Sequence, residues 1–158
     1  MKPSYRILLA LLSCLPLCAY ADLNGKVVRV LDGDTVEILV GQQTTRVRLN
    51  GIDAPEKDQP YGQRSRQYLT GLIGGKQVVA IGGNKDRYGR LLATIILHNQ
   101  DVNAIQVYAG MAWAYRYQGR LTVERYADYE HNAKSANRGL WSQKDPIEPR
   151  KWRNYKRY

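Results

Sequence analysis

Short β-branched segments separated by glycine-containing turns fill the first half of the sequence, and this pattern constrains the fold most strongly. Gly25–Leu31 leads through an Asp-Gly pair into Thr35–Val40. A turn at residues 41–43 then leads into Thr44–Asn50, where apolar and arginine side chains alternate. An Asp-Gly pair between two such segments is a strong hairpin signal, and alternation with a period of two is typical of a half-buried strand. We therefore predict three consecutive antiparallel strands.

The second half of the sequence adds two strands and three helices. Gln77–Ile81 and Leu91–Leu97 are short, apolar and rich in β-branched residues, as strands are. Helices are predicted at Gln63–Leu72, Asp101–Tyr108 and Val123–Asn137. Five short strands with interspersed helices predict an α+β, mainly β fold, namely a small five-stranded barrel of the oligonucleotide-binding kind with about three helices.

The N-terminus has the three parts of a secretory signal peptide. Met1–Arg6 is basic, Ile7–Leu17 is almost entirely apolar, and Ala19-Tyr20-Ala21 has the small-x-small pattern of a cleavage site. We predict a signal peptide over residues 1–21 and an exported protein, periplasmic or secreted. The apolar run is shorter than the ~20 residues of a membrane-spanning helix, so no stable membrane association is expected after cleavage. Lipid attachment at Cys14 is the alternative.

Charge and cysteine content narrow the class of partner. The chain has 24 basic and 14 acidic residues, and loss of Lys2 and Arg6 with the signal peptide lowers its net charge from +10 to +8. Cys14 and Cys18 leave with the same segment, so the mature chain folds without disulfides. A basic exported protein is expected to meet a polyanion, whether nucleic acid, anionic lipid or a cell-wall polymer.

Two aspartates are candidates for binding a metal. Asp34 opens the second predicted strand and Asp53 follows the third, so a hairpin would bring both carboxylates to one end of the sheet. Two hard oxygen ligands without neighbouring cysteine or histidine favour Ca²⁺ or Mg²⁺ over zinc. An Asp-Gly-Asp-Thr sequence is also good turn chemistry, and Asp53 could cap a loop. Spacing alone leaves both interpretations open.

Three further residues suit phosphodiester chemistry. Arg48 lies on the polar face of the strand that leads to Asp53, Glu56 follows three residues later, and Arg90 ends a glycine turn. Hydrolysis needs a group that orients or deprotonates water and cations that offset the charge growing on the phosphate oxygens. Arginine stays protonated and binds two oxygens at once. Taken singly, each arginine could also be a solvated surface charge.

Three separated segments resemble the staphylococcal nuclease (thermonuclease-like) family. These are Val30–Val36, Arg48–Glu56 and Asp86–Arg90, and they occur in the family's order. Shorter matches lie at residues 101–104 and 139–141. The resemblance covers roughly Asn24–Trp141, so we predict one nuclease-like domain over residues 22–141 and a basic, proline-containing C-terminal tail over residues 142–158. The tail is either docked or loose, and it either contributes to nucleic-acid affinity or is a solvated appendage.

The resemblance implies a function. The family is a five-stranded oligonucleotide-binding barrel with three helices that hydrolyses DNA and RNA with Ca²⁺ and leaves 3′-phosphate ends. By the same resemblance, Asp34 and Asp53 supply the calcium carboxylates. Ala54 supplies a backbone carbonyl, although the best-known members have threonine there. Only the carbonyl is used, so this difference changes little.

The remaining site residues are assigned in the same way. Arg48 and Arg90 match the arginines that clamp the phosphate, and Glu56 matches the general base. Four residues match positions beside the bound nucleotide: Arg87, Tyr88, Tyr115 and Tyr117. The resemblance thus implies an exported, monomeric, calcium-dependent, sugar-nonspecific endonuclease acting on DNA and RNA.

A non-catalytic nucleic-acid-binding module on the same barrel is the alternative. Relatives of that kind typically lack the carboxylates and arginines of the site, whereas this chain has all five. A basic cell-surface protein would explain the charge but not the three segments.

Overall fold

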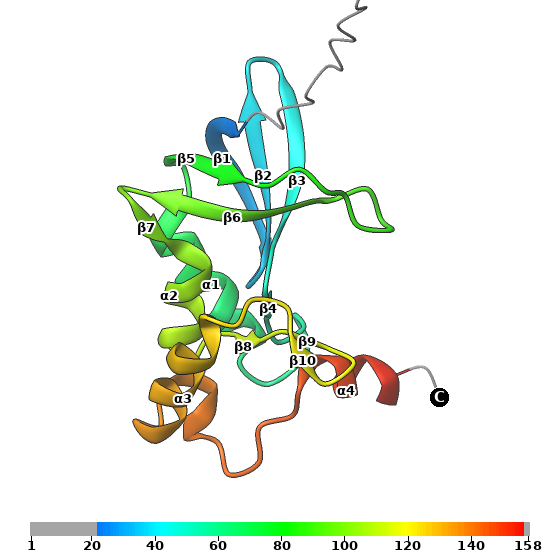
Figure 1. The fold of residues 1–158 in the computed structure, drawn as a ribbon, viewed down its shortest axis with the longest axis vertical. Helices are drawn as coiled ribbons and strands as arrows, with labels where there is room; N and C mark the ends of the chain where they lie inside the picture. Colours follow the sequence, from blue (N-terminus) through cyan, green and yellow to red (C-terminus); the bar gives the residue numbers. More distant parts are fainter. Residues whose placement is uncertain (1–21, 157–158) are drawn as a thin grey trace, which may run out of the picture.

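The computed structural model describes residues 22–156 and contains a five-stranded barrel with the helices gathered towards one end of it (Figure 1). The predicted fold is confirmed. The barrel strands are β1 (Leu23–Asp32), β2 (Thr35–Val40), β3 (Gln43–Leu49), β5 (Gln77–Ile81) and β6 (Leu91–Leu97). Short strands are β4 (Ile52–Asp53), β7 (Gln100–Asp101), β8 (Trp113–Ala114), β9 (Arg116–Tyr117) and β10 (Arg120–Leu121).

Within residues 22–156 the structure has four α-helices and a 3₁₀-helix, η1. They are α1 (Gly62–Ile73), α2 (Val102–Tyr108), α3 (Tyr126–Ser135), η1 (Gly139–Ser142) and α4 (Pro149–Tyr155). The first three correspond to the predicted helices. The predicted helix at Val123–Asn137 is shorter than expected at both ends, and Asn137 follows α3 with a positive φ of 50°. Helix α4 was not predicted.

The barrel is closed by one parallel pairing. The strand order is β3-β2-β1-β5-β6, and the neighbours in this order are antiparallel. Strands β3 and β6 then pair in parallel, with Val47 opposite Leu91 and Arg48 opposite Leu92. This closure removes the free sheet edges and places the start of β6 beside the end of β3.

Apolar side chains from the strands and from α1 and α2 fill the barrel interior. Leu49 of β3 and Ile95 of β6 are completely buried, as are Leu69 and Ile73 of α1. The alternation seen in the sequence directs such residues inward and leaves the arginines of β3 on the outer face. A second, smaller cluster of buried residues lies beside α3 and consists of Ala133, Leu140 and Trp141.

The β1–β2 turn is pressed against the helices. A Cβ atom at Gly33 would lie 1.8 Å from Ser65 Oγ of α1, so only glycine fits there. Gln106 of α2 donates a hydrogen bond to the Gly33 carbonyl at 2.6 Å. The position of Asp34, the next residue, is therefore fixed by packing on both sides.

The described helices are also short. Between residues 22 and 156, no helix combines the length and apolar character that crossing a bilayer requires. The predicted signal peptide over residues 1–21 lies outside the described residues.

Candidate active site

Arg48 is the hub of a polar cluster at the end of β3. Its Nη1 donates to the carbonyls of Leu49 and Ile52, at 3.0 and 2.9 Å. Its Nη2 lies 3.1 Å from Asp34 Oδ2 and 3.1 Å from Asp53 Oδ1. One guanidinium thus joins the start of β2 to the segment that follows β3.

Asp34 and Asp53 converge as the sequence predicts. Their contacting oxygens each lie 3.1 Å from the same nitrogen, so no more than 6.2 Å separates them. Both residues are buried, with only 6% and 3% of their surface exposed. Asp34 Oδ2 also accepts a hydrogen bond from the Ala54 N–H at 2.7 Å, which places the backbone of residue 54 beside both carboxylates.

Carboxylates outnumber guanidiniums in this cluster. The two guanidiniums are Arg48 and Arg153, and the four carboxylates are Asp32, Asp34, Asp53 and Glu56. Burial and the neighbouring Asp34 raise the pKa of Asp32 to about 7. Burial also raises the pKa of Asp53, although hydrogen bonds and charges from Arg153 and Arg48 oppose the change. The donor set is made of hard carboxylate oxygens, and an added cation would offset their excess charge. These residues therefore fit a calcium ion.

Glu56 lies on the loop between β4 and α1. Its N–H donates to Gln59 Oε1 at 3.1 Å, and its carbonyl accepts from the Gln59 N–H at 2.9 Å. A Cβ at Gly62 would lie 1.8 Å from the Glu56 carbonyl oxygen, so the loop folds closely onto the start of α1. The Glu56 side chain is 38% exposed and can meet water, unlike the buried aspartates.

Arg90 is held by Asp86 rather than by the Arg48 cluster. Its Nε and Nη2 each lie 2.7 Å from Asp86 Oδ2. Asp86 Oδ1 accepts from the N–H groups of Tyr88 and Arg90, and Gly89 completes the turn with a φ of 77°. This network fixes the direction of the Arg90 side chain before any ligand binds.

The parallel β3–β6 pairing brings Arg90 beside Arg46. The two arginines line an open groove of about 400 Å³, together with Glu37, Thr44, Tyr88 and Gly89. Arg46 and Arg48 share one face of β3, because they are two residues apart on a strand. Arg90 therefore borders the same face as Arg48, although no hydrogen bond or ion pair of the described residues joins them.

The residues expected beside a nucleotide make no hydrogen bond or ion pair with Asp34, Arg48 or Asp53 in the described part of the chain. The guanidinium carbons of Arg87 and Arg90 lie 4.9 and 5.4 Å from the centre of the Tyr88 ring, which is largely exposed. The Tyr115 N–H donates to the Gly51 carbonyl at 2.9 Å, two residues before Asp53. Tyr117, in β9, is also exposed.

Three residues of the site were missed by sequence reasoning. Asp32, whose carboxylate accepts from the Asp34 N–H at 3.1 Å, was assigned only to the hairpin turn. Asp86 orients Arg90, and its signal was present, since an aspartate that opens a turn bonds to the backbone two residues on. Arg153 of α4 contacts both Asp53 and Glu56. It is one of several basic residues in the tail, and no spacing in the sequence singles it out.

Fold and site define a barrel of the oligonucleotide-binding kind whose outer face carries an acidic cluster and two fixed arginines. The staphylococcal nuclease homologue family matches residues 46–143, which is more than half of the chain. The chain belongs to this family, as its sequence segments predicted.

Similar proteins include named nucleases. The chain is 46% identical over 144 residues to micrococcal nuclease from Shigella flexneri, covering 85% of this chain and 83% of the relative. It is 44% identical over 144 residues to protein ParB from Escherichia coli, covering 85% and 81%. An uncharacterized endonuclease from Haemophilus influenzae is 39% identical over 147 residues, covering 92% and 82%. The similarity thus extends over most of the relatives' length.

Proposed function

We propose that the protein is an exported, monomeric, calcium-dependent endonuclease that hydrolyses phosphodiester bonds of DNA and RNA and leaves 3′-phosphate ends. The observation that carries the proposal is the network in which Arg48 joins two buried aspartates, with Glu56 at its solvent-accessible side. Membership of a nuclease family and the names of two relatives support the reaction class.

Asp34, Asp53 and the carbonyl of Ala54 would hold the calcium ion. The described part of the chain has no group of three or more His, Cys, Asp and Glu side chains arranged to hold a metal. Two carboxylates, a carbonyl and water nevertheless suit calcium, which takes six to eight oxygen ligands of these kinds. When bound, the ion would supply positive charge beside the phosphate.

Arg48 and Arg90 would grip the phosphate oxygens. A guanidinium can donate two parallel hydrogen bonds to a phosphate. Arg90 is held by Asp86 through Nε and Nη2, so its Nη1 hydrogens can still donate, and this fixed orientation reduces the reorganisation needed as charge develops on the phosphate. Arg48 would exchange its contacts with Asp34 and Asp53 for phosphate oxygens when calcium binds those aspartates. Lysine would supply charge without the fork.

Glu56 would accept or orient a proton of the attacking water. Its carboxylate is accessible, and Arg153 Nη1 lies 2.7 Å from Glu56 Oε1 and 3.2 Å from Asp53 Oδ1. No more than 5.9 Å therefore separates these two carboxylate oxygens, so a water on Glu56 would lie beside the metal carboxylate. A general base of this kind typically contributes a factor of ~10²–10⁴ in rate.

Contacts to phosphate oxygens read neither the base nor the sugar 2′-hydroxyl, so a site built on them would act on both DNA and RNA. The exposed rings of Tyr88 and Tyr117, with Tyr115 and Arg87, would contact the nucleotide next to the scissile phosphate. Cleavage after Ala21 would release the mature protein with Asp22 as its first residue. A non-catalytic binding module remains the competing function.

Digestion with and without metal tests the proposal directly. Plasmid DNA and RNA are incubated with the protein in Ca²⁺, in Mg²⁺ and in excess chelator, and the products are analysed for 3′-phosphate ends. We expect both substrates to be cut in Ca²⁺ and to survive in chelator. The Asp34→Asn variant should need more calcium, since one ligand charge is lost. Undiminished cutting in chelator would refute the calcium site, and binding without cutting would establish the binding module.

A further inference from the structure

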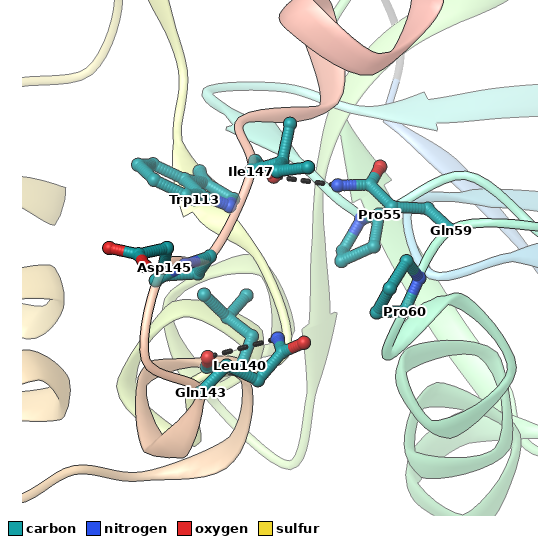
Figure 2. Close-up of a pocket in the computed structure, with 9 residues that line it drawn as sticks. Pro55, Gln59, Pro60, Trp113, Leu140, Gln143, Asp145 and Ile147 are labelled. Atoms are coloured by element: carbon teal, nitrogen blue, oxygen red, sulfur yellow. Dashed lines mark hydrogen bonds between the residues drawn. The ribbon is translucent and has the colours of Figure 1, made fainter.

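The C-terminal segment is fastened to the loop that carries Glu56. Gln59 Nε2 donates to the Ile147 carbonyl at 2.6 Å, and Figure 2 shows this bond beside Pro55 and Pro60. A cavity of only about 50 Å³ remains between the loop and residues 143–147. Farther along, Trp152 Nε1 donates to Asp58 Oδ1 at 3.3 Å, and Lys156 pairs with the same carboxylate.

This attachment directs Arg153 into the acidic cluster. Its Nη1 and Nη2 donate to the two carboxylate oxygens of Asp53, at 3.2 and 3.0 Å. Nη1 also donates to Glu56 Oε1 at 2.7 Å. A single guanidinium therefore bridges the proposed metal carboxylate and the proposed general base.

These contacts occupy atoms that the reaction needs. A cation bound through Asp53 and a water bound to Glu56 would require the same carboxylate oxygens that Arg153 now holds. The guanidinium itself carries the positive charge that the excess of carboxylates favours. Arg153 and a calcium ion are therefore competing cations for one group of ligands.

We propose that α4 is a latch, by which we mean that Arg153 occupies the carboxylates of Asp53 and Glu56 until calcium displaces it. The site is closed while these contacts are made and open when they are broken. This inference rests on the proposed calcium site. The bonds that join Gln59 to Ile147 and Asp58 to Trp152 and Lys156 do not use the Asp53 or Glu56 side chains, so they keep the segment attached when Arg153 leaves. Calcium binding then opens the cluster and frees the Glu56 carboxylate in the same step. If only a fraction of the molecules is open, the apparent affinity for calcium equals the intrinsic affinity multiplied by that fraction.

Calcium titration without substrate tests the latch. Isothermal titration calorimetry is carried out on the wild type, on Arg153→Gln and on the matched control Arg150→Gln. Arg150 lies exposed on the same helix, and its side chain has no hydrogen bond or ion pair with the described residues. We expect Arg153→Gln to bind calcium about tenfold more tightly than wild type, as it would if about one molecule in ten is open. Arg150→Gln should match the wild type.

A second measurement needs no change at Arg153. The chain has three tryptophans, so its indole N–H groups give three resolvable NMR signals, and Trp152→Phe assigns the signal of Trp152. Calcium should shift the Trp152 signal in the wild-type protein, because displacement of the adjacent Arg153 side chain changes the charge around α4 while the Trp152–Asp58 bond persists. A signal that stays in place through calcium saturation would overturn the latch.

The outcomes separate the latch from the proposed function. Equal calcium affinity in all three proteins would overturn the latch and leave the calcium site intact. No calcium binding by any of them would remove the calcium site and the latch together. Slower cleavage by Arg153→Gln in saturating calcium, with unchanged affinity, would make Arg153 a substrate contact and would also overturn the latch.

Discussion

Two buried networks of acids and arginines can be compared in this protein. In the first, Arg48 joins Asp34 and Asp53. In the second, Glu130 of α3 accepts hydrogen bonds from Arg116 at 2.8 and 3.2 Å and from Lys134 at 2.9 Å. Both centre on carboxylates that are almost completely buried. They differ in the balance of charge.

The Glu130 network has one acid and two cations, whereas the Arg48 cluster has more acids than cations. Burial raises the pKa of Glu130, but the bonds from Arg116 and Lys134 outweigh burial and hold it below its ordinary value. At Asp53, the effect of burial exceeds the opposing effects of Arg153 and Arg48, so the pKa is raised. The two networks differ in that Glu130 is balanced by its own cations, whereas the excess of carboxylates around Arg48 would favour an added cation, as the proposed calcium site requires.

Among the changes that compare the two networks, Arg48→Lys should give the largest effect. Lysine keeps one charge but cannot hold both aspartates and a phosphate, so we expect cleavage to fall by about 10²–10³. Single-turnover cleavage and thermal unfolding of the same samples measure it. If the arginine serves the fold alone, as in the Glu130 network, the unfolding midpoint will fall and the cleavage rate of the folded protein will not.

Glu130→Gln should lower the stability of the fold and leave the cleavage rate almost unchanged. It leaves two partly exposed cations without their carboxylate, and we expect the free energy of unfolding to decrease by about 1–2 kcal/mol. Cleavage by the folded fraction should stay within a few-fold of wild type. Urea unfolding and cleavage at a temperature where the variant is folded measure the two quantities. Glu124→Gln is the control, because Glu124 is an exposed glutamate that precedes the same helix.

The pH dependence of stability should show the smallest of these effects. The pKa of Glu130 is lower in the folded than in the unfolded protein. Its contribution to stability is therefore complete above the unfolded pKa of about 4.3 and is lost as the pH falls through the folded value. Urea unfolding from pH 7 to pH 3 should show a shallower acid decline in Glu130→Gln than in wild type. Identical slopes would contradict the lowered pKa.

Much of the fold could be predicted because its signals are local. Alternating residues and an Asp-Gly turn mark β1–β2, and Asp101 caps α2 by accepting from the Ala104 N–H at 3.0 Å. The convergence of Asp34 and Asp53 follows from the same hairpin logic. The family resemblance correctly identified the rest of the barrel.

Features that depend on contacts distant in sequence could not be predicted. Arg153 bonds to Asp53, which lies 100 residues away in the sequence, and no hydrophobic periodicity or turn signal in the tail predicts this pairing. Helix α4 has a proline in its first turn, which is a start signal, but its seven residues are too few for a clear apolar pattern. The buried position of Glu130 likewise depends on Arg116, which lies outside α3.

Glu56→Gln is the most direct test of the catalytic assignment. The amide is nearly isosteric, so the contacts of Arg48 and Arg90 should persist, whereas the ability to take a proton from water is lost. Single-turnover cleavage and equilibrium binding of an oligonucleotide, both in saturating Ca²⁺, are measured on wild type and variant. We predict binding within a few-fold of wild type and cleavage slower by about 10²–10⁴. Cleavage by Glu56→Gln at the wild-type rate would show that another group activates the water.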